Sequence, residues 1–190
     1  MKKLALLVGA IILISSVGTV GVMAVFTDSA AVDANQFTTG TLDISTNPAT
    51  AVVTYSAMAP GDSTTQSLIV TNAGTLALRY AITASATNAD SKALKDQLVL
   101  TIKTVDVTTP GTPCDNFDGT QLYTGDVDST AGALVGDSAQ GAQAGDRALA
   151  AAASETMCFR VALPTSTGNS FQNATTTATF TFAAEQTANN

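Results

Sequence analysis

Hydrophobic and polar residues alternate with a period of two along much of the chain, and no stretch sustains the period of an amphipathic helix. Four stretches show this alternation most clearly. Their apolar faces consist of Leu76, Leu78, Tyr80 and Ile82; Leu98, Leu100 and Ile102; Met157, Phe159, Val161 and Leu163; and Ala178, Phe180, Phe182 and Ala184. An apolar face opposite a threonine-rich face is typical of a half-buried antiparallel strand. The four stretches therefore predict strands that share one core.

Turn-forming residues separate the predicted strands. Pro-Gly-Asp at 60–62 and Asn-Ala-Gly at 72–74 bracket a strand over 67–71, and residues 164–169 separate the last two strands. About eight such strands around one core predict an all-β fold: a jelly-roll-like or immunoglobulin-like two-sheet antiparallel sandwich. One or two short helices are expected beside the sheets, the first over residues 90–97.

The stretch 108–153 is less regular, since it contains two prolines, many glycines and many other small residues. One strand is expected in it, at 121–124. Residues 148–153 favour a helix by propensity, but we interpret them as a loop and keep a short helix as the alternative. We therefore interpret 108–153 as an irregular insertion in a β-sandwich domain that spans residues 35–190.

The first residues have the organisation of a secretory leader. Lys2 and Lys3 give a positive start, residues 4–14 are apolar, and small residues then lead to Ala24. This pattern favours cleavage between Ala24 and Val25, so that residues 1–24 are a signal peptide. The longer stretch from Leu4 to Phe26 is also about long enough to cross a bilayer, which needs ~20 residues, so an uncleaved anchor is the alternative. Residues 25–34 follow as a short extended segment.

Composition excludes several functional classes. The net charge is −7, and it falls to about −9 once the two leader lysines are removed, so phosphate backbones would be repelled and no nucleic acid is expected as a partner. The chain has no histidine, which removes Ser-His and Cys-His catalysis and every His-ligated metal site. Paired carboxylates of a glycosidase are not favoured, because there is no tryptophan to stack a sugar. No cofactor site is expected.

Two cysteines, Cys114 and Cys158, lie in a chain that we expect to be exported. An oxidised pair is the natural interpretation there, and two unpaired thiols are the alternative. Closing so long a loop would stabilise the fold by roughly 4 kcal/mol in the chain-entropy model. The predicted disulfide would tether the insertion to the strand around Cys158.

Four aspartates lie close together in sequence: Asp115, Asp118, Asp126 and Asp128. Oxygen-rich loops of this kind can hold calcium, although the order of ligands in an EF-hand is absent. Aspartates are also ordinary turn formers, and solvated turns are the favoured interpretation. Asn173 begins a formal glycosylation sequon, Asn-Ala-Thr, which matters only in a host that glycosylates asparagine.

Seven short motifs lie at both ends and in the middle of the chain, leaving 108–153 uncovered. They are Val-Met-Ala at 22–24, Val-Phe-Thr-Asp at 25–28, Phe-Thr-Thr-Gly-Thr-Leu-Asp at 37–43, Met-Ala-Pro-Gly-Asp at 58–62, Val-Thr-Asn-Ala-Gly-Thr-Leu-Ala-Leu at 70–78, Gly-Asn-Ser-Phe at 168–171 and Ala-Thr-Phe-Thr-Phe-Ala-Ala-Glu at 178–185. With these motifs the chain resembles the TasA/camelysin family of secreted biofilm-matrix fibre proteins. Each motif is unspecific when taken singly. Their order and spacing make the resemblance specific.

The resemblance implies a jelly-roll subunit that is secreted through a family-dedicated signal peptidase and polymerises head to tail into extracellular or cell-surface fibres. Minor fibre subunits or anchoring subunits are the other partners it implies. The new N-terminal segment would become a strand of the neighbouring subunit, which fits a sandwich with an open edge. The candidate donor strand consists of Val25, Phe26, Thr27, Asp28, Ser29, Ala30, Ala31, Val32 and Asp33. An ordinary first strand or a frayed end is the alternative.

Some camelysin relatives are described as surface metalloproteases. This chain departs from a zinc-protease pattern, because without histidine it has no His-Glu-x-x-His motif. We therefore expect a structural protein and no enzyme. A surface metalloprotease and a non-polymerising surface binding module are the alternatives.

Overall fold

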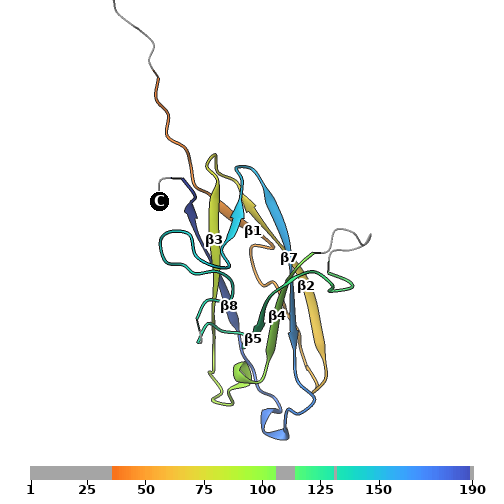
Figure 1. Ribbon diagram of the computed structural model, residues 1–190. Coiled ribbons are helices and arrows are strands. Elements are labelled where there is room, and N and C mark those ends of the chain that lie inside the picture. Colours follow the sequence, from red (N-terminus) through yellow and green to blue (C-terminus); the bar gives the residue numbers. More distant parts are fainter. Residues whose placement is uncertain (1–35, 106–113, 131, 189–190) are drawn as a thin grey trace, which may run out of the picture. The chain divides into compact units, whose positions relative to one another are not determined.

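Figure 1 shows the computed structural model of the chain, which describes residues 36–105, 114–130 and 132–188. The chain divides into two units, Met1–Thr38 and Thr39–Asn190. The described residues of the first unit, 36–38, form neither helix nor strand. All the strands described below belong to the second unit.

The second unit is a sandwich of two antiparallel sheets. The five-stranded sheet has the order β1 (Ile44–Asn47), β2 (Ser63–Asn72), β7 (Ser154–Ala162), β4 (Val99–Thr104) and β5 (Gln121–Gly125), and the three-stranded sheet has the order β6 (Arg147–Leu149), β3 (Leu78–Ala86) and β8 (Ala178–Gln186). Figure 1 shows the two sheets as separate layers, with β3 and β8 in one and β2, β4 and β7 in the other. The predicted all-β, two-sheet antiparallel sandwich is confirmed.

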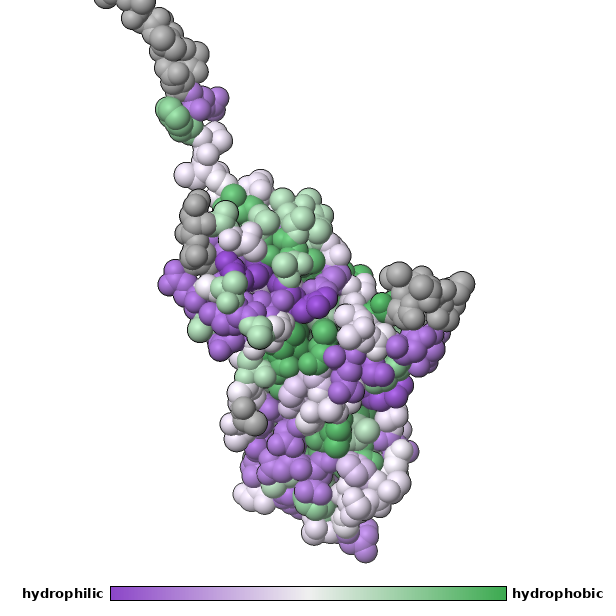
Figure 2. Space-filling view, in the orientation of Figure 1, coloured by the Kyte–Doolittle hydropathy of each residue, from purple (hydrophilic) through white to green (hydrophobic). Residues whose placement is uncertain are grey.

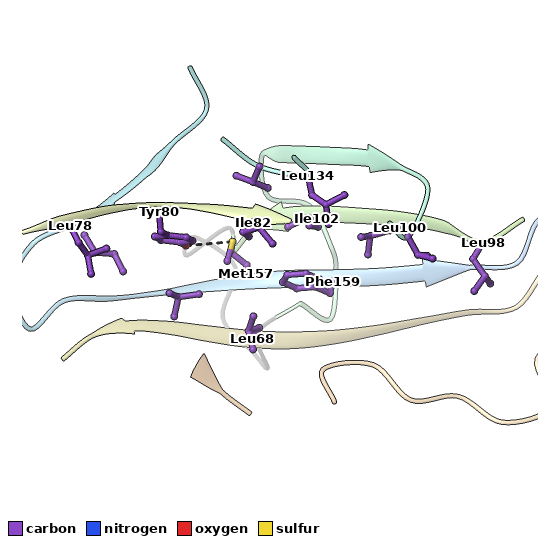
Figure 3. Close-up of a cluster of buried hydrophobic side chains, with 14 of the residues drawn as sticks. Leu68, Leu78, Tyr80, Ile82, Leu98, Leu100, Ile102, Leu134, Met157 and Phe159 are labelled. Carbon is purple, nitrogen blue, oxygen red and sulfur yellow. Dashed lines mark hydrogen bonds between the residues drawn. The ribbon is translucent and has the colours of Figure 1, made fainter. Parts of the chain in front are cut away.

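The core lies between the sheets and is built by the predicted apolar faces. Tyr80 of β3 and Met157 and Phe159 of β7 are almost fully buried, and the Tyr80 hydroxyl oxygen lies 3.9 Å from Met157 Sδ (Figure 3). Burying each large apolar side chain contributes about 1.5–3 kcal/mol. The alternation that was visible in the sequence is therefore what holds the two layers together.

The stretch 108–153, which the sequence suggested to be an irregular insertion, contributes strands and core residues to the sandwich. It supplies β5 and β6, and it places Val127, Leu134 and Val135 in the core. Residues 129–135 of this stretch, which precede β6 in the chain, lie along the same edge of β3 as β6. There the Ile82 N–H donates to the Val135 C=O over 2.8 Å, and the Ser129 N–H donates to the Ala84 C=O over 2.8 Å. β3 is thus covered along one edge by this stretch and along the other by β8. The strand expected at 121–124 is confirmed as β5.

The short helix expected over residues 90–97 is present only as one 3-10 turn, and no α-helix forms there. This turn is η1 (Leu94–Asp96), and a second one, η2 (Asn169–Phe171), precedes β8. Asp90 Oδ1 accepts the Lys92 N–H over 3.0 Å, and Asn88 Oδ1 accepts the Ala93 N–H over 2.7 Å. These side chains offer the backbone an alternative to helical hydrogen bonds, and Ala93 takes a left-handed φ of 57°. Residues 150–153 form a turn after β6, in agreement with the loop interpretation.

Candidate functional site

The most prominent feature of the sandwich is a groove of about 1220 Å³. It is lined by β2, by the end of β7, by β8, and by the segment 48–60 that joins β1 to β2. Leu68, Val161, Phe180 and Phe182 belong to both the groove lining and the packing of the core. The groove is therefore a place where the hydrophobic interior of the sandwich opens to the outside. Figure 2 shows that apolar patches reach the surface of the sandwich between polar regions.

One wall of the groove is β8, whose far edge is open. Within the described residues β8 pairs only with β3, and it stands at the end of the three-stranded sheet. Phe180 packs edge-on against Phe159, with 5.3 Å between ring centroids, and Phe182 lies 6.0 Å from Tyr80. Both phenylalanines are nevertheless only half-buried, because their other side faces the groove. A free edge thus runs beside incompletely covered apolar side chains.

The opposite wall combines β2 with the segment 48–60. β1 pairs with β2 only over residues 69–72, so the first part of β2 has no strand on that side among the described residues. The segment 48–60 lies there without forming a strand, and Val52, Val53 and Met58 pack against the core from it. The groove therefore has strand edges on both walls.

The chemistry of the groove is uncharged. Its described lining consists of aliphatic and aromatic side chains, threonines and a few other neutral polar residues, with no Asp, Glu, Lys or Arg among them. Asn173, the asparagine of the sequon, is exposed and belongs to this lining. Such a surface suits an apolar or neutral extended segment, whose backbone could also pair with a strand edge.

The predicted disulfide between Cys114 and Cys158 is present, with 5.4 Å between the Cα atoms. Cys158 lies on the face of β7 that points away from the core, where it packs with Cys114 and Phe117 in a small second cluster. The Phe117 ring contacts two cations: its centroid lies 3.8 Å from the Arg160 guanidinium carbon and 4.8 Å from Lys103 Nζ. The disulfide therefore fixes the loop after residue 113 to the outside of the five-stranded sheet.

The four aspartates proposed for calcium are not assembled into a metal site. Among the residues that the structure describes, no three His, Cys, Asp or Glu side chains form a group that could hold a metal ion. Asp128 is engaged by Lys95 Nζ at 2.8 Å, and this hydrogen bond holds the pKa of the Asp128 carboxyl below its usual range. Asp118 accepts from Asn116 Nδ2 over 2.7 Å, and Asp126 offers its backbone carbonyl to Tyr123. Asp115 is exposed in the same turn as Asp118.

A polar network inside the sandwich was missed by the sequence reasoning. Tyr80 donates its hydroxyl to Glu155, and Glu155 forms an ion pair with Arg147 of β6. Burial raises the pKa of the Tyr80 phenol, and the carboxylate of Glu155 raises it further. The signal that could have found the network is the tyrosine at a core-facing position, since a buried phenol needs a hydrogen-bond partner. The network connects β3, β6 and β7 and has a structural role.

Other basic residues in the described part of the chain are also engaged within the fold. Arg79 Nε lies 2.9 Å from Glu185 Oε1, Lys92 Nζ donates to the Gln172 carbonyl, and Arg160 Nε donates to Thr65 Oγ1 over 2.8 Å. None of these cations faces the groove.

The predicted cleavage site at Ala24 and Val25 and the candidate donor strand 25–33 lie outside the described residues. Among the residues that are described, no helix has both the length and the apolar character needed to cross a bilayer.

No curated protein matches the chain. The family model described as camelysin metallo-endopeptidase matches residues 1–190, the whole of the chain. That description points toward an enzyme, whereas the sequence led us to expect none. The match supports the TasA/camelysin resemblance drawn from the sequence motifs, and the chain belongs to the camelysin family.

Proposed function

We propose that this protein is a secreted structural subunit that polymerises into extracellular or biofilm-matrix fibres by donating residues 25–33 to the groove of the next subunit. The observation that carries the proposal is the open edge of β8 beside an uncharged groove. An unpaired edge is a template for a strand from another chain, and native proteins usually protect it. Here the half-buried Phe180 and Phe182 give an incoming strand apolar surface to cover as well.

The length and position of the donor segment support the same proposal. Residues 25–33 precede the first strand of the sandwich, which begins at Ile44, by ten residues, and they include no strand-breaking proline or glycine. A segment that leaves one subunit and completes the sheet of another makes a contact that does not close on itself. Repetition of such a contact generates a filament.

The uncharged lining favours one face of the donor strand. In an extended segment, one face consists of the odd-numbered residues from Val25 to Asp33 and the other of the even-numbered residues, including Asp28. Each face thus carries one aspartate, but Asp33 is the last residue of the segment and Asp28 lies within it. A buried carboxylate without a partner is costly, so we expect the face whose aspartate is terminal to enter the groove. Two adjacent alanines, Ala30 and Ala31, then occupy opposite faces and form a matched pair for a test.

The test compares four forms of the secreted chain by electron microscopy and sedimentation: the unaltered protein, a deletion of residues 25–33, Ala31→Asp and Ala30→Asp. The unaltered protein and Ala30→Asp should form fibres, whereas the deletion and Ala31→Asp should remain folded, soluble subunits. Normal fibres from the deletion variant would show that assembly uses another surface. Loss of fibres with both alanine variants would contradict the assignment of faces.

The accompanying proposals concern export. We place cleavage between Ala24 and Val25, by a signal peptidase of the family-dedicated type, and we place the protein in the extracellular matrix or at the cell surface. Minor fibre or anchoring subunits are further proposed partners. N-terminal sequencing of the secreted protein tests the cleavage site. A start at Met1 would instead favour a non-polymerising surface module held by an uncleaved anchor.

The second candidate function is that of a surface metallo-endopeptidase, which the family description favours. The residues do not fit such a metal centre: the chain has no histidine, its two cysteines are joined to each other, and the described carboxylates form no group of three. Catalytic zinc usually has three protein ligands and an open position. Casein cleavage by purified protein, abolished by a chelator, would establish this function in place of a purely structural one.

A further inference from the structure

The segment 48–60, which we call the strap, contributes apolar side chains to the groove without belonging to a sheet. It contains Val52, Val53 and Met58, which pack against the core although each remains half-buried. Tyr55 is 48% exposed. The strap thus covers part of the groove with apolar side chains that are neither fully buried nor fully exposed.

Among the described residues, backbone hydrogen bonds and strand pairing join the strap to the rest of the fold only at its two ends. At one end, Asn47 of β1 pairs opposite Ile69 of β2. At the other end, the Asp62 carboxylate accepts the Ala59 N–H over 2.8 Å, and the adjacent Gly61 N–H donates to the Leu163 carbonyl over 2.7 Å.

Between these points the backbone of residues 48–58 forms no hydrogen bond to any other described segment. Side-chain contacts alone hold the middle of the strap in place. Among the described residues, the polar contact of this middle part is made by the Tyr55 hydroxyl, which donates to Asp62 Oδ2 over 3.3 Å.

We propose that the strap is an internal plug, which covers the groove in the isolated subunit and must move aside when a strand pairs with β8. This inference rests on the strand-donation function proposed above. An incoming strand would outcompete the strap because it can form backbone hydrogen bonds with the free edge of β8, which the strap does not form. The strap lowers the apparent affinity for the strand in proportion to the fraction of subunits in which the groove is uncovered. It therefore holds back assembly.

The first test weakens the hold of the strap in the full chain. Val52→Ser and Val53→Ser, singly and together, remove apolar contacts of the strap and leave β8 unchanged. If the open fraction rises tenfold, the apparent affinity for the strand rises by about the same factor, and the lag before fibre growth shortens accordingly. Val99→Ser is the matched control, because Val99 is 37% exposed on β4 and does not line the groove. It should leave the lag unchanged.

The second test follows hydrogen–deuterium exchange in the unaltered subunit, kept below the concentration at which it assembles. A synthetic peptide with the sequence of residues 25–33 is added as the probe. Exchange should slow in β8, which gains a neighbour, and should quicken in 48–60, which is displaced. This measurement needs no substitution, so a variant that folds poorly cannot obscure the result.

The outcomes separate this inference from the function on which it rests. Protection of β8 with faster exchange in 48–60, together with shorter lags for the strap variants, supports both. Protection of β8 with unchanged or slower exchange in 48–60, or strap variants that behave like Val99→Ser, overturns the plug and leaves strand donation standing. No protection of β8 and no fibres from the unaltered chain overturns both proposals.

Discussion

Asn72 offers the sharpest test of the internal packing. Its side chain is completely buried at the end of β2 and joins three parts of the chain. Nδ2 lies 2.8 Å from the Leu76 carbonyl, 3.0 Å from that of Ala150 and 3.3 Å from that of Leu149, and Oδ1 accepts the Gly74 N–H over 3.0 Å. We expect Asn72→Ala to leave these groups without partners in a site that is closed to water.

The magnitude follows from the number of hydrogens available. The amide of Asn72 carries two, so its three nearby carbonyls share two full donor bonds, and Oδ1 adds one accepted bond. At about 0.5–1.5 kcal/mol net for each of these three bonds, the loss should be roughly 1.5–4.5 kcal/mol. A loss in the free energy of unfolding that exceeds the loss for a single hydrogen bond would identify Asn72 as a junction between segments.

Urea unfolding, monitored by circular dichroism, measures the change in the free energy of unfolding. Asn88→Ala is the control, because Asn88 is exposed and its Oδ1 accepts a single bond from the Ala93 N–H. It should cost about 0.5–1.5 kcal/mol at most. If Asn72→Ala costs no more than Asn88→Ala, the reasoning that buried bonds add across this junction is refuted.

Three further predictions concern the disulfide, pH and metal. Replacing Cys114 and Cys158 together by serine should lower the free energy of unfolding by roughly 2–5 kcal/mol, and a thiol assay on the unreduced, denatured parent protein should find no free thiol. The N–H groups of Asp137 and Gln143 hold the pKa of the Asp146 carboxyl below its ordinary value. The stabilisation by this carboxylate is therefore present above the pKa that it has in the unfolded chain, and it is lost as the pH falls through the folded pKa. Asp146→Asn should therefore reduce the loss of stability between pH 5 and pH 3, and an unchanged urea profile would contradict this. A chelator should leave the thermal midpoint unchanged, because the described acidic residues form no metal-binding group, and a fall in the midpoint would restore the calcium interpretation.

The sequence was sufficient to predict the strands that have one apolar and one polar face. The alternation around Tyr80 and Phe159 correctly assigned which side chains enter the core, because period-two patterning is a local property of a half-buried strand. The pairing of Cys114 with Cys158 was also predicted, from the expected compartment. Local pattern and chemistry were enough in these cases.

The remaining features depend on contacts between distant parts of the chain. The pairing of Val135 with Ile82 joins a glycine-rich stretch to the edge of β3, and nothing in the local pattern around Val135 indicates it. The open edge of β8 likewise depends on which strands end up as neighbours. At residues 90–97 the difference from the expected helix was local: the side chains of Asn88 and Asp90 bind backbone N–H groups that a helix would have used.

The internal ion pairs and ring contacts of the basic residues affect how strongly two copies of the chain repel each other. Arg79, Lys95 and Arg147 form ion pairs, while Lys103 and Arg160 are held by the Phe117 ring. The carboxylates outnumber these cations, so an approaching molecule meets mainly unneutralised negative charge. Two copies of the chain must then approach against a mutual repulsion whose range is set by the Debye length, about 10 Å at 0.1 M salt. Ionic strength therefore acts as an external control on encounters between subunits, independent of the uncharged groove.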